Sequence, residues 1–101
     1  MLVLCHKRLK EYITHIEKHT EATGVAHVLG TKGGVAVAMV MKDTRLCFMN
    51  SHLSAHQHQT KRRNDDAKEI IEGVKLGYQG VDILHQFHHL VWMGDLNYRY
   101  E

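Results

Sequence analysis

The chain has 101 residues, of which 44% are hydrophobic and 24% are charged. This length allows one domain with a modest core, and this balance of residue types is typical of a soluble globular protein. The formal net charge of +2 at pH 7 is too small to indicate, by itself, binding to nucleic acid or to an acidic membrane.

The first third of the chain predicts a strand, a short helical segment and a loop. Residues 1–5 are apolar, which predicts a short buried strand, and they are too few for a signal-peptide core or a membrane span. Within residues 7–16, helical spacing of apolar side chains predicts a short helix or turn. The glycine-rich residues 20–34 are expected to pass from a strand into a loop.

A hairpin is predicted in the middle of the chain. Residues 35–41 are apolar on both faces of a strand, which predicts a sheet that is covered on both sides. Residues 42–44 form a turn, and residues 45–50 form the second strand. Cys5 and Cys47 are far apart in apolar surroundings, and we expect two buried free thiols in a reducing cytosol.

A helix and a final strand follow the polar loop at residues 51–60. Residues 61–76 carry apolar side chains at helical intervals, with Asn64, Asp65 and Asp66 near the start, where capping and anionic residues are favoured. Residues 90–93 predict the last strand. The mixture of strands and helices predicts an α+β fold in which outer helices cover a sandwich of sheets.

The end of the last strand carries the first candidate site. Asp95 and Asn97 follow an apolar run that ends in Gly94. A carboxylate at the tip of a buried strand can accept a proton from water or orient a metal-bound water, and an asparagine can donate hydrogen bonds to a phosphate. The alternative is an ordinary turn, since Gly, Asp and Asn are common turn residues.

Three further segments carry candidate residues. Asn50 ends the second predicted hairpin strand, and His52 and His56 follow it. His52 can stabilise charge on a phosphate or act as a general acid; the alternative is a surface loop with several histidines. Lys32 lies in a glycine-rich segment whose spacing is not that of a Walker A loop, and an ordinary turn is the alternative. Arg63 lies in a basic segment that is equally typical of a solvated helix start.

The chain has ten histidines, and histidine is a common zinc ligand. Several of them are clustered, at residues 56, 58, 85, 88 and 89. No cysteine accompanies these clusters at the spacing of a structural zinc site, so zinc is not favoured.

Taken in order, the segments GTKGGVAVAMVM, CFMNSHLSAH, RRNDDAKEI and HLVWMGDLNYR resemble the catalytic domain of the inositol polyphosphate 5-phosphatases. The corresponding family motifs read GNKGGV or GNKGAV, NSHLAAH, RRN and W-x-GDLNYR. The resemblance covers nearly the whole chain, with Thr31 in place of the usual Asn and Ser54 in place of a common Ala. The wider endonuclease/exonuclease/phosphatase superfamily shares the Gly-Asp-x-Asn pattern but usually lacks the RRN motif and the Tyr-Arg ending.

The resemblance implies an α/β/β/α four-layer sandwich and Mg²⁺-dependent removal of the 5-phosphate from phosphoinositide headgroups or soluble inositol polyphosphates. By position, Asp95 would orient or deprotonate the attacking water, and Asn97 would hold the scissile phosphate near the metal. Asn50 and His52 would contact that phosphate and stabilise its charge. The remaining motif positions, expected at the substrate, are Lys32, His56, Arg63 and Arg99, of which Arg99 is also open to a structural role.

The resemblance also indicates that residues 1–101 are the middle portion of such a domain, incomplete at both ends. The family's Mg²⁺-binding glutamate lies upstream of the matched segments, and its Ser-Asp-His block lies downstream. One carboxylate makes a poor Mg²⁺ site, so we expect the isolated chain to be inactive. The alternatives are a non-catalytic module that binds inositol phosphates and another hydrolase of the superfamily, a nuclease or sphingomyelinase. A cytoplasmic protein with peripheral membrane contact and no nucleic-acid partner is expected, while its oligomeric state stays open.

Overall fold

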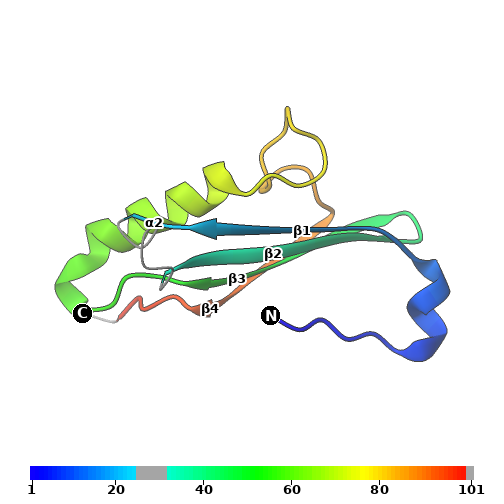
Figure 1. The fold of residues 1–101 in the computed structure, drawn as a ribbon, viewed down its shortest axis with the longest axis horizontal. Helices are drawn as coiled ribbons and strands as arrows, with labels where there is room; N and C mark the ends of the chain where they lie inside the picture. The colour runs from blue at the N-terminus through cyan, green and yellow to red at the C-terminus, as the bar shows by residue number, and fades with distance from the viewer. Residues whose placement is uncertain (25–31, 100–101) are drawn as a thin grey trace.

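The computed structural model describes residues 1–24 and 32–99, in which four strands form one sheet and one α-helix lies along it (Figure 1). The elements are η1 (Lys7–Tyr12), β1 (Ile13–Ala22), β2 (Gly33–Met41), β3 (Thr44–His52), η2 (Gln57–Gln59), α2 (Thr60–Gly73) and β4 (His89–Asp95). The strand order is β1-β2-β3-β4, with antiparallel pairing except between β3 and β4, which are parallel. This mixed sheet with its helix confirms the predicted α+β class.

The predicted central hairpin is confirmed. Strands β2 and β3 pair without interruption from Met41 opposite Thr44 to Gly33 opposite His52. The turn between them places Lys42 at a φ of 55°, in the left-handed region. The parallel neighbour β4 needs a long crossover from β3, and α2 supplies it, as is usual for parallel strands.

Helix α2 is confirmed with slightly different bounds and covers one face of the sheet. Ile70 is fully buried against the sheet, where β2 presents the small side chains of Ala36 and Ala38. At Gly34 a Cβ atom would lie 3.0 Å from Ile70 Cγ2, so the glycine lets the helix approach the strand closely. The buried core cluster comprises Ala36, Ala38, Cys47, Met49, Leu53, Ile70, Val74, Leu76 and Ile83.

The opposite face of the sheet, which we call the open face, has no helical cover among the described residues. Strand register places Val37, Phe48 and Val91 side by side on it. Val91 is 46% exposed and Met93 is 38% exposed. Within the described chain, α2 covers one side of residues 35–41, while on the open face Met39 is buried and Val35, Val37 and Met41 are half-buried.

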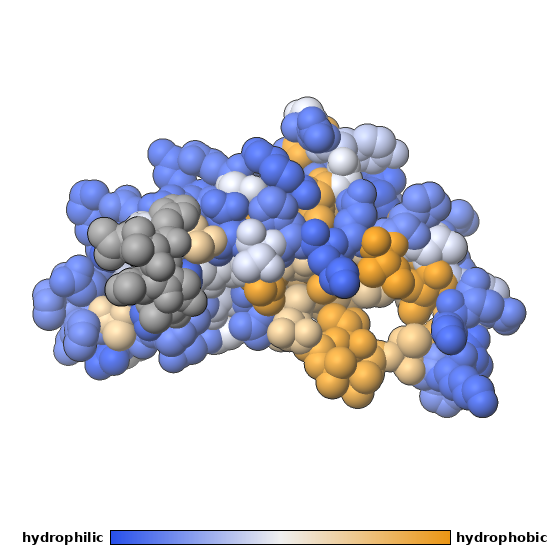
Figure 2. Space-filling view, in the orientation of Figure 1, coloured by the Kyte–Doolittle hydropathy of each residue, from blue (hydrophilic) through white to orange (hydrophobic). Residues whose placement is uncertain are grey.

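The prediction of a buried strand at residues 1–5 is wrong. The structure has no strand there, and Leu2 and Leu4 are each 81% exposed. Figure 2 shows hydrophobic surface gathered along this N-terminal segment beside the sheet. Cys5 is exposed as well, so only Cys47 fits the expectation of buried thiols. An apolar run of five residues does not by itself specify a strand, because a strand also needs a partner to pair with.

The predicted helix over residues 7–16 is correct only at its start. The 3₁₀ helix η1 ends at Tyr12, and β1 begins at Ile13. The register of β1 shifts between Thr14 and Glu17, and His15 adopts a φ of 52°. This bulge explains why Ile13 and Ile16 have helical spacing in the sequence although both lie on a strand.

The glycine-rich segment falls partly outside the described residues, which resume at Lys32. Gly30 and Thr31 lie in the part that is not described, and Gly33 and Gly34 open strand β2. No helix of the described ranges is long and apolar enough to cross a membrane.

Candidate active site

Two predicted site residues meet because β3 and β4 run parallel. The register pairs Ser51 with Gly94 and His52 with Asp95, so the carboxyl ends of both strands lie at one edge of the sheet. The Nε2 atom of His52 lies 3.5 Å from Oδ2 of Asp95, and the two side chains are 48% and 66% exposed. Both project from the open face, where a ligand can reach the imidazole and the carboxylate together.

A lysine completes a row of polar groups at this edge. Lys32 Nζ lies 3.2 Å from His52 Nε2, and Lys32 directly precedes Gly33, which pairs with His52 across the β2–β3 ladder. A neutral imidazole nitrogen can accept a hydrogen bond from the ammonium group. The cation is therefore held beside the His52–Asp95 pair, where it can attract an anion.

A hollow of about 300 Å³ lies beside this row, within the size range of small-ligand sites. It brings Asn50 together with Lys32 and His52, so that an amide, an ammonium and an imidazole face one space. Its lining residues are Thr20, Glu21, Ala22, Lys32, Gly33, Gly34, Val35, Asn50 and His52.

The sheet edge is held together by a close main-chain approach that the sequence analysis did not identify. Gly94 has a φ of 126°, and a Cβ atom there would lie 2.2 Å from the carbonyl oxygen of Ser51. Trp92 Nε1 donates a hydrogen bond of 2.8 Å to Ser51 Oγ. Only glycine permits this backbone conformation at this separation, so the Gly of the Gly-Asp pair is required by the geometry that delivers Asp95.

Asn97 lies next to the site and binds the backbone of the neighbouring segment. Its Nδ2 donates to the carbonyl oxygen of Leu53 at 2.9 Å, and its φ of 57° turns the chain after β4. The N–H of Leu53 donates to the carbonyl oxygen of Asp95 at 3.1 Å. Leu53 therefore links the segment after β3 to the segment after β4.

His56, Arg63 and Arg99 lie away from the hollow, whereas Asp95 and Asn97 lie beside it without lining it. Arg63 is 1% exposed, and its guanidinium donates to main-chain carbonyls of the segment after β3. His56 is exposed and stacks on His58 with ring centroids 6.0 Å apart. Arg99 is exposed near the end of the described chain. The structure thus brings together Lys32, Asn50, His52 and Asp95, with Asn97 adjacent, and gives Arg63 a place inside the protein.

A bound divalent cation needs several ligand side chains gathered in one place. Across residues 1–24 and 32–99, no group of three or more His, Cys, Asp or Glu side chains has the geometry of a metal site. Asp95 and the side-chain oxygen of Asn50 are hard oxygen donors near the hollow, which is the ligand type that Mg²⁺ and Ca²⁺ prefer. These residues fit part of such a shell and are too few to complete one.

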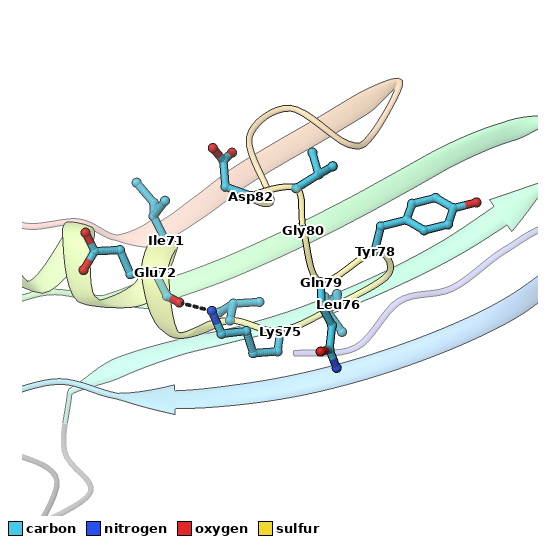
Figure 3. A pocket seen from close by; sticks show the side chains of 10 residues that line it. Ile71, Glu72, Lys75, Leu76, Tyr78, Gln79, Gly80 and Asp82 are labelled. Atoms are coloured by element: carbon cyan, nitrogen blue, oxygen red, sulfur yellow. Dashed lines mark hydrogen bonds between the residues drawn. The ribbon is translucent and has the colours of Figure 1, made fainter.

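A second hollow, of about 420 Å³, lies away from these residues at the carboxyl end of α2 (Figure 3). Lys75 Nζ donates there to the carbonyl oxygen of Glu72 at 2.7 Å. None of the predicted site residues lines it. The candidate site is therefore the polar edge of the sheet and not this hollow.

The comparisons with known proteins agree with the motif order. Residues 1–101 match the family model described as Endonuclease/Exonuclease/phosphatase family 2. The chain is 38% identical over 102 residues to phosphatidylinositol 3,4,5-trisphosphate 5-phosphatase 1 of Homo sapiens, covering 98% of this chain and 9% of that protein. It is 36% identical over 96 residues to type II inositol 1,4,5-trisphosphate 5-phosphatase of Mus musculus, covering 89% of this chain and 10% of that protein.

A solved structure gives the same result for the fold. The inositol polyphosphate 5-phosphatase domain of SPsynaptojanin, in complex with inositol (1,4)-bisphosphate and a calcium ion, superposes with a TM-score of 0.81 at 35% identity. The match covers 94% of this chain and 26% of that chain. The chain spans about a tenth of the length of the curated relatives, so their complete activities are not carried over by the match alone. The chain belongs to the Endonuclease/Exonuclease/phosphatase family 2, within which it corresponds to part of an inositol polyphosphate 5-phosphatase catalytic domain.

Proposed function

We propose that this chain forms part of a Mg²⁺-dependent phosphoester hydrolase that removes the 5-phosphate from phosphoinositides or soluble inositol polyphosphates. The observation that carries the proposal is the row of Lys32, His52 and Asp95, with contacts of 3.2 Å and 3.5 Å, at one edge of the sheet. The superposed relative contains an inositol bisphosphate, a ligand of the same chemical class as the proposed product.

Each residue of this row has a chemical role in the proposal. Asp95 orients or deprotonates the attacking water, because its carboxylate is exposed and reaches the space in front of His52. Asn50 donates a hydrogen bond to the scissile phosphate from its amide nitrogen, and His52 donates from a ring nitrogen that carries a proton, so that both stabilise its charge. Lys32 supplies a fixed positive charge beside them. Asn97, bonded to Leu53, holds the segment after Asp95 close to the phosphate.

Mg²⁺ is the proposed cofactor. Asp95, Asn50 and Asn97 offer the oxygen donors that such an ion takes, and the solved relative was crystallised with calcium, another oxygen-preferring ion. When bound, Mg²⁺ would neutralise charge on the phosphate oxygens. Because Mg²⁺ in phosphoryl-transfer sites is held by one or two carboxylates together with phosphate oxygens and water, a further carboxylate from outside residues 1–101 is part of the proposal.

The proposed domain is a four-layer α/β/β/α sandwich of which residues 1–101 are the middle portion. The exposed side chains of Val91 and Met93 on the open face support a second sheet that packs there. Such a sheet would also enclose the polar edge, because His52 and Asp95 project from the same face as Val91. Burial of this kind strengthens hydrogen bonds to a phosphate.

We further propose a cytoplasmic protein with peripheral membrane contact, because phosphoinositide headgroups are presented at membrane surfaces. The substrate class supports this location, and the same hollow would accept a soluble inositol phosphate. Nucleic acid is not a proposed partner.

The test uses the protein translated from the complete reading frame that contains this chain. Phosphate release is measured from inositol 1,4,5-trisphosphate and from inositol 1,4-bisphosphate, each with Mg²⁺ or with EDTA. The proposal expects release from the trisphosphate alone, and only with Mg²⁺. Equal release from both compounds would contradict 5-phosphate specificity. Binding without turnover would favour the non-catalytic alternative, and cleavage of DNA or sphingomyelin would favour another hydrolase of the superfamily.

A further inference from the structure

Helix α2 buries two charged side chains that both face the segment after β3. Arg63 is 1% exposed and Asp66 is 0% exposed, and they lie three residues apart on the helix. Burying a charge is costly unless hydrogen bonds compensate it. The hydrogen-bond partners of these two residues therefore indicate the role of the buried charges.

Asp66 binds the beginning of the segment. Its Oδ2 accepts hydrogen bonds from the N–H of Ser54 at 2.9 Å and from Ser54 Oγ at 2.6 Å. Its Oδ1 accepts from Arg62 Nε at 3.3 Å, which leaves the carboxylate compensated. The amide that follows Leu53 is thus fixed to the helix.

Arg63 binds the rest of the segment. Nη1 donates to the carbonyl oxygens of Ser54 and His56, at 3.3 Å and 2.5 Å, and Nη2 donates to that of Gln57 at 3.2 Å. His56 has a φ of 76°, a conformation that non-glycine residues rarely adopt. The guanidinium therefore holds a strained turn in place, and its planar fork of donors is suited to several carbonyls at once.

The segment after β4 is attached to the same part of the helix. The ring of Tyr98 lies 5.4 Å from the guanidinium carbon of Arg63, and Tyr98 Oη donates to Asn64 Oδ1 at 2.5 Å. The two segments also meet at Leu53, which bonds to Asp95 and Asn97. About one turn of helix, Arg63–Asp66, thus holds both segments that leave the candidate site.

We propose that Arg63 and Asp66 are positioning residues, which fix the Ser54–Gln57 segment and Tyr98 and thereby set the placement of His52, Asp95 and Asn97. The expected effect on catalysis rests on the proposed function. The structural part, that Arg63 and Asp66 fix the Ser54–Gln57 segment and Tyr98, does not. It assigns Arg63 a role through the protein backbone and not at the phosphate. Asp66 shares this positioning role, which the resemblance to the family does not imply for it.

The first experiment compares Asp66→Asn with Asp65→Asn in the protein from the complete reading frame. Asp65 is the neighbouring residue on the same helix, is exposed, and bonds only Lys61 among the contacts described, at 2.9 Å. Asp66→Asn is expected to accelerate amide hydrogen exchange over residues 52–58 and to lower kcat on the order of ten- to a hundredfold with KM nearly unchanged, because small displacements of catalytic groups are costly. Asp65→Asn is expected to change neither.

A double-mutant cycle separates positioning from general destabilisation. Asp66→Asn and Tyr98→Phe are combined, since their hydrogen bonds tie the segments after β3 and β4 to the same part of the helix and neither residue is proposed to touch the phosphate or the metal. If both residues act by positioning, the fold-loss of kcat in the double variant is expected to be smaller than the product of the two single fold-losses. Losses that multiply would show independent effects and overturn the proposal. Tyr98→Phe, which removes one hydroxyl from an exposed ring, serves as a milder variant if Asp66→Asn does not fold, and a several-fold loss of kcat is expected.

Failure of the proposed function is recognised separately. If the wild-type protein releases no phosphate, the proposed function fails, and the predicted loss of kcat fails with it. The hydrogen-exchange comparison of Asp66→Asn with Asp65→Asn then decides alone the structural part, that is, whether Asp66 fixes the segment. Equal exchange over residues 52–58 in Asp66→Asn and Asp65→Asn would overturn that part. An active wild-type protein whose kcat is unchanged by Asp66→Asn would overturn positioning while leaving the proposed function intact.

Discussion

His52 and Asp95 face each other across two parallel strands, with Nε2 of the imidazole 3.5 Å from Oδ2 of the carboxylate. The main-chain ladder between β3 and β4 fixes this pair, because the two residues are directly opposite in register. A slip of one residue in either strand would place the two side chains on opposite faces of the sheet. Contacts that secure the register therefore secure the site.

Gly94→Ala is expected to destabilise the protein by about 1–3 kcal/mol and to displace Asp95, because a non-glycine residue is strained at this conformation. The added Cβ would lie 2.2 Å from the carbonyl oxygen of Ser51, a separation that requires main-chain movement. Urea unfolding monitored by Trp92 fluorescence measures the loss. Gly80→Ala is the matched control, because a Cβ there would meet no atom within 4 Å. Equal stability of the two variants would contradict the role of this close approach.

Lys32→Gln is expected to raise KM for an inositol phosphate about tenfold, corresponding to about 1.4 kcal/mol, with a smaller change in kcat. The reason is the loss of the positive charge held 3.2 Å from His52 at the edge of the hollow. Steady-state kinetics at fixed ionic strength provide the measurement. Lys42→Gln is the control, because Lys42 lies in the turn at the other end of β2 and contacts Tyr12. A KM that both substitutions leave unchanged would remove Lys32 from the binding site.

The two cysteines are expected to react at very different rates with a thiol reagent at pH 8. Burial raises the pKa of the Cys47 thiol from its ordinary value of 9.0 to about 11, so the reactive thiolate is scarce. Cys5 is exposed and should react first. Mass spectrometry of the labelled protein identifies the site, and both cysteines should label rapidly in urea. Fast labelling of Cys47 in the folded protein would show that the sheet opens readily.

The same pKa shift predicts that stability falls as the pH rises above 9. In this range the unfolded chain loses the Cys47 proton while the folded protein retains it. The free energy of unfolding therefore decreases as the pH rises, up to the folded pKa of about 11. Urea midpoints at pH 8 and pH 10 measure the change. In Cys47→Ala the part of this pH dependence that comes from the Cys47 thiol should disappear, although the variant is less stable than the wild type at both pH values.

Val91→Lys is expected to reduce self-association of the isolated 101-residue chain. Val91 is 46% exposed on the open face of the edge strand β4, and uncovered apolar sheet faces favour association. Sedimentation velocity over a concentration series measures the effect. Leu84→Lys is the control, because Leu84 is 45% exposed but lies in the connection before β4 and not on the open face. In the protein from the complete reading frame, Val91→Lys should instead destabilise the domain, because the proposed second sheet would bury the charge.

The sequence allowed the central elements to be predicted because their patterns are long and regular. The apolar run of β2, the polar turn and the helical spacing around Ile70 each have one simple structural interpretation. Residues 1–5 and the start of β1 were predicted wrongly for a different reason. An exposed apolar segment and a β-bulge depend on what packs nearby, which local spacing does not reveal.

The candidate site was predictable in composition but not in arrangement. The motifs identified Lys32, His52 and Asp95, whereas the parallel pairing that joins them comes from the topology. The motif predicts Arg63 at the substrate because a basic residue suits a phosphate, and the structure shows it 1% exposed beside the ring of Tyr98. No property of one residue distinguishes these two uses of an arginine, because both rest on the same fork of donors.

The most direct test of the central claim is the kcat of Asp95→Asn on inositol 1,4,5-trisphosphate, measured with Mg²⁺ in the protein from the complete reading frame. The account predicts a loss on the order of a hundredfold or more, the usual scale for a catalytic acid or base, while Asp43→Asn in the β2–β3 turn retains full activity. Retention of full activity by Asp95→Asn in a protein that requires Mg²⁺ would contradict the claim that the paired ends of β3 and β4 form the catalytic site.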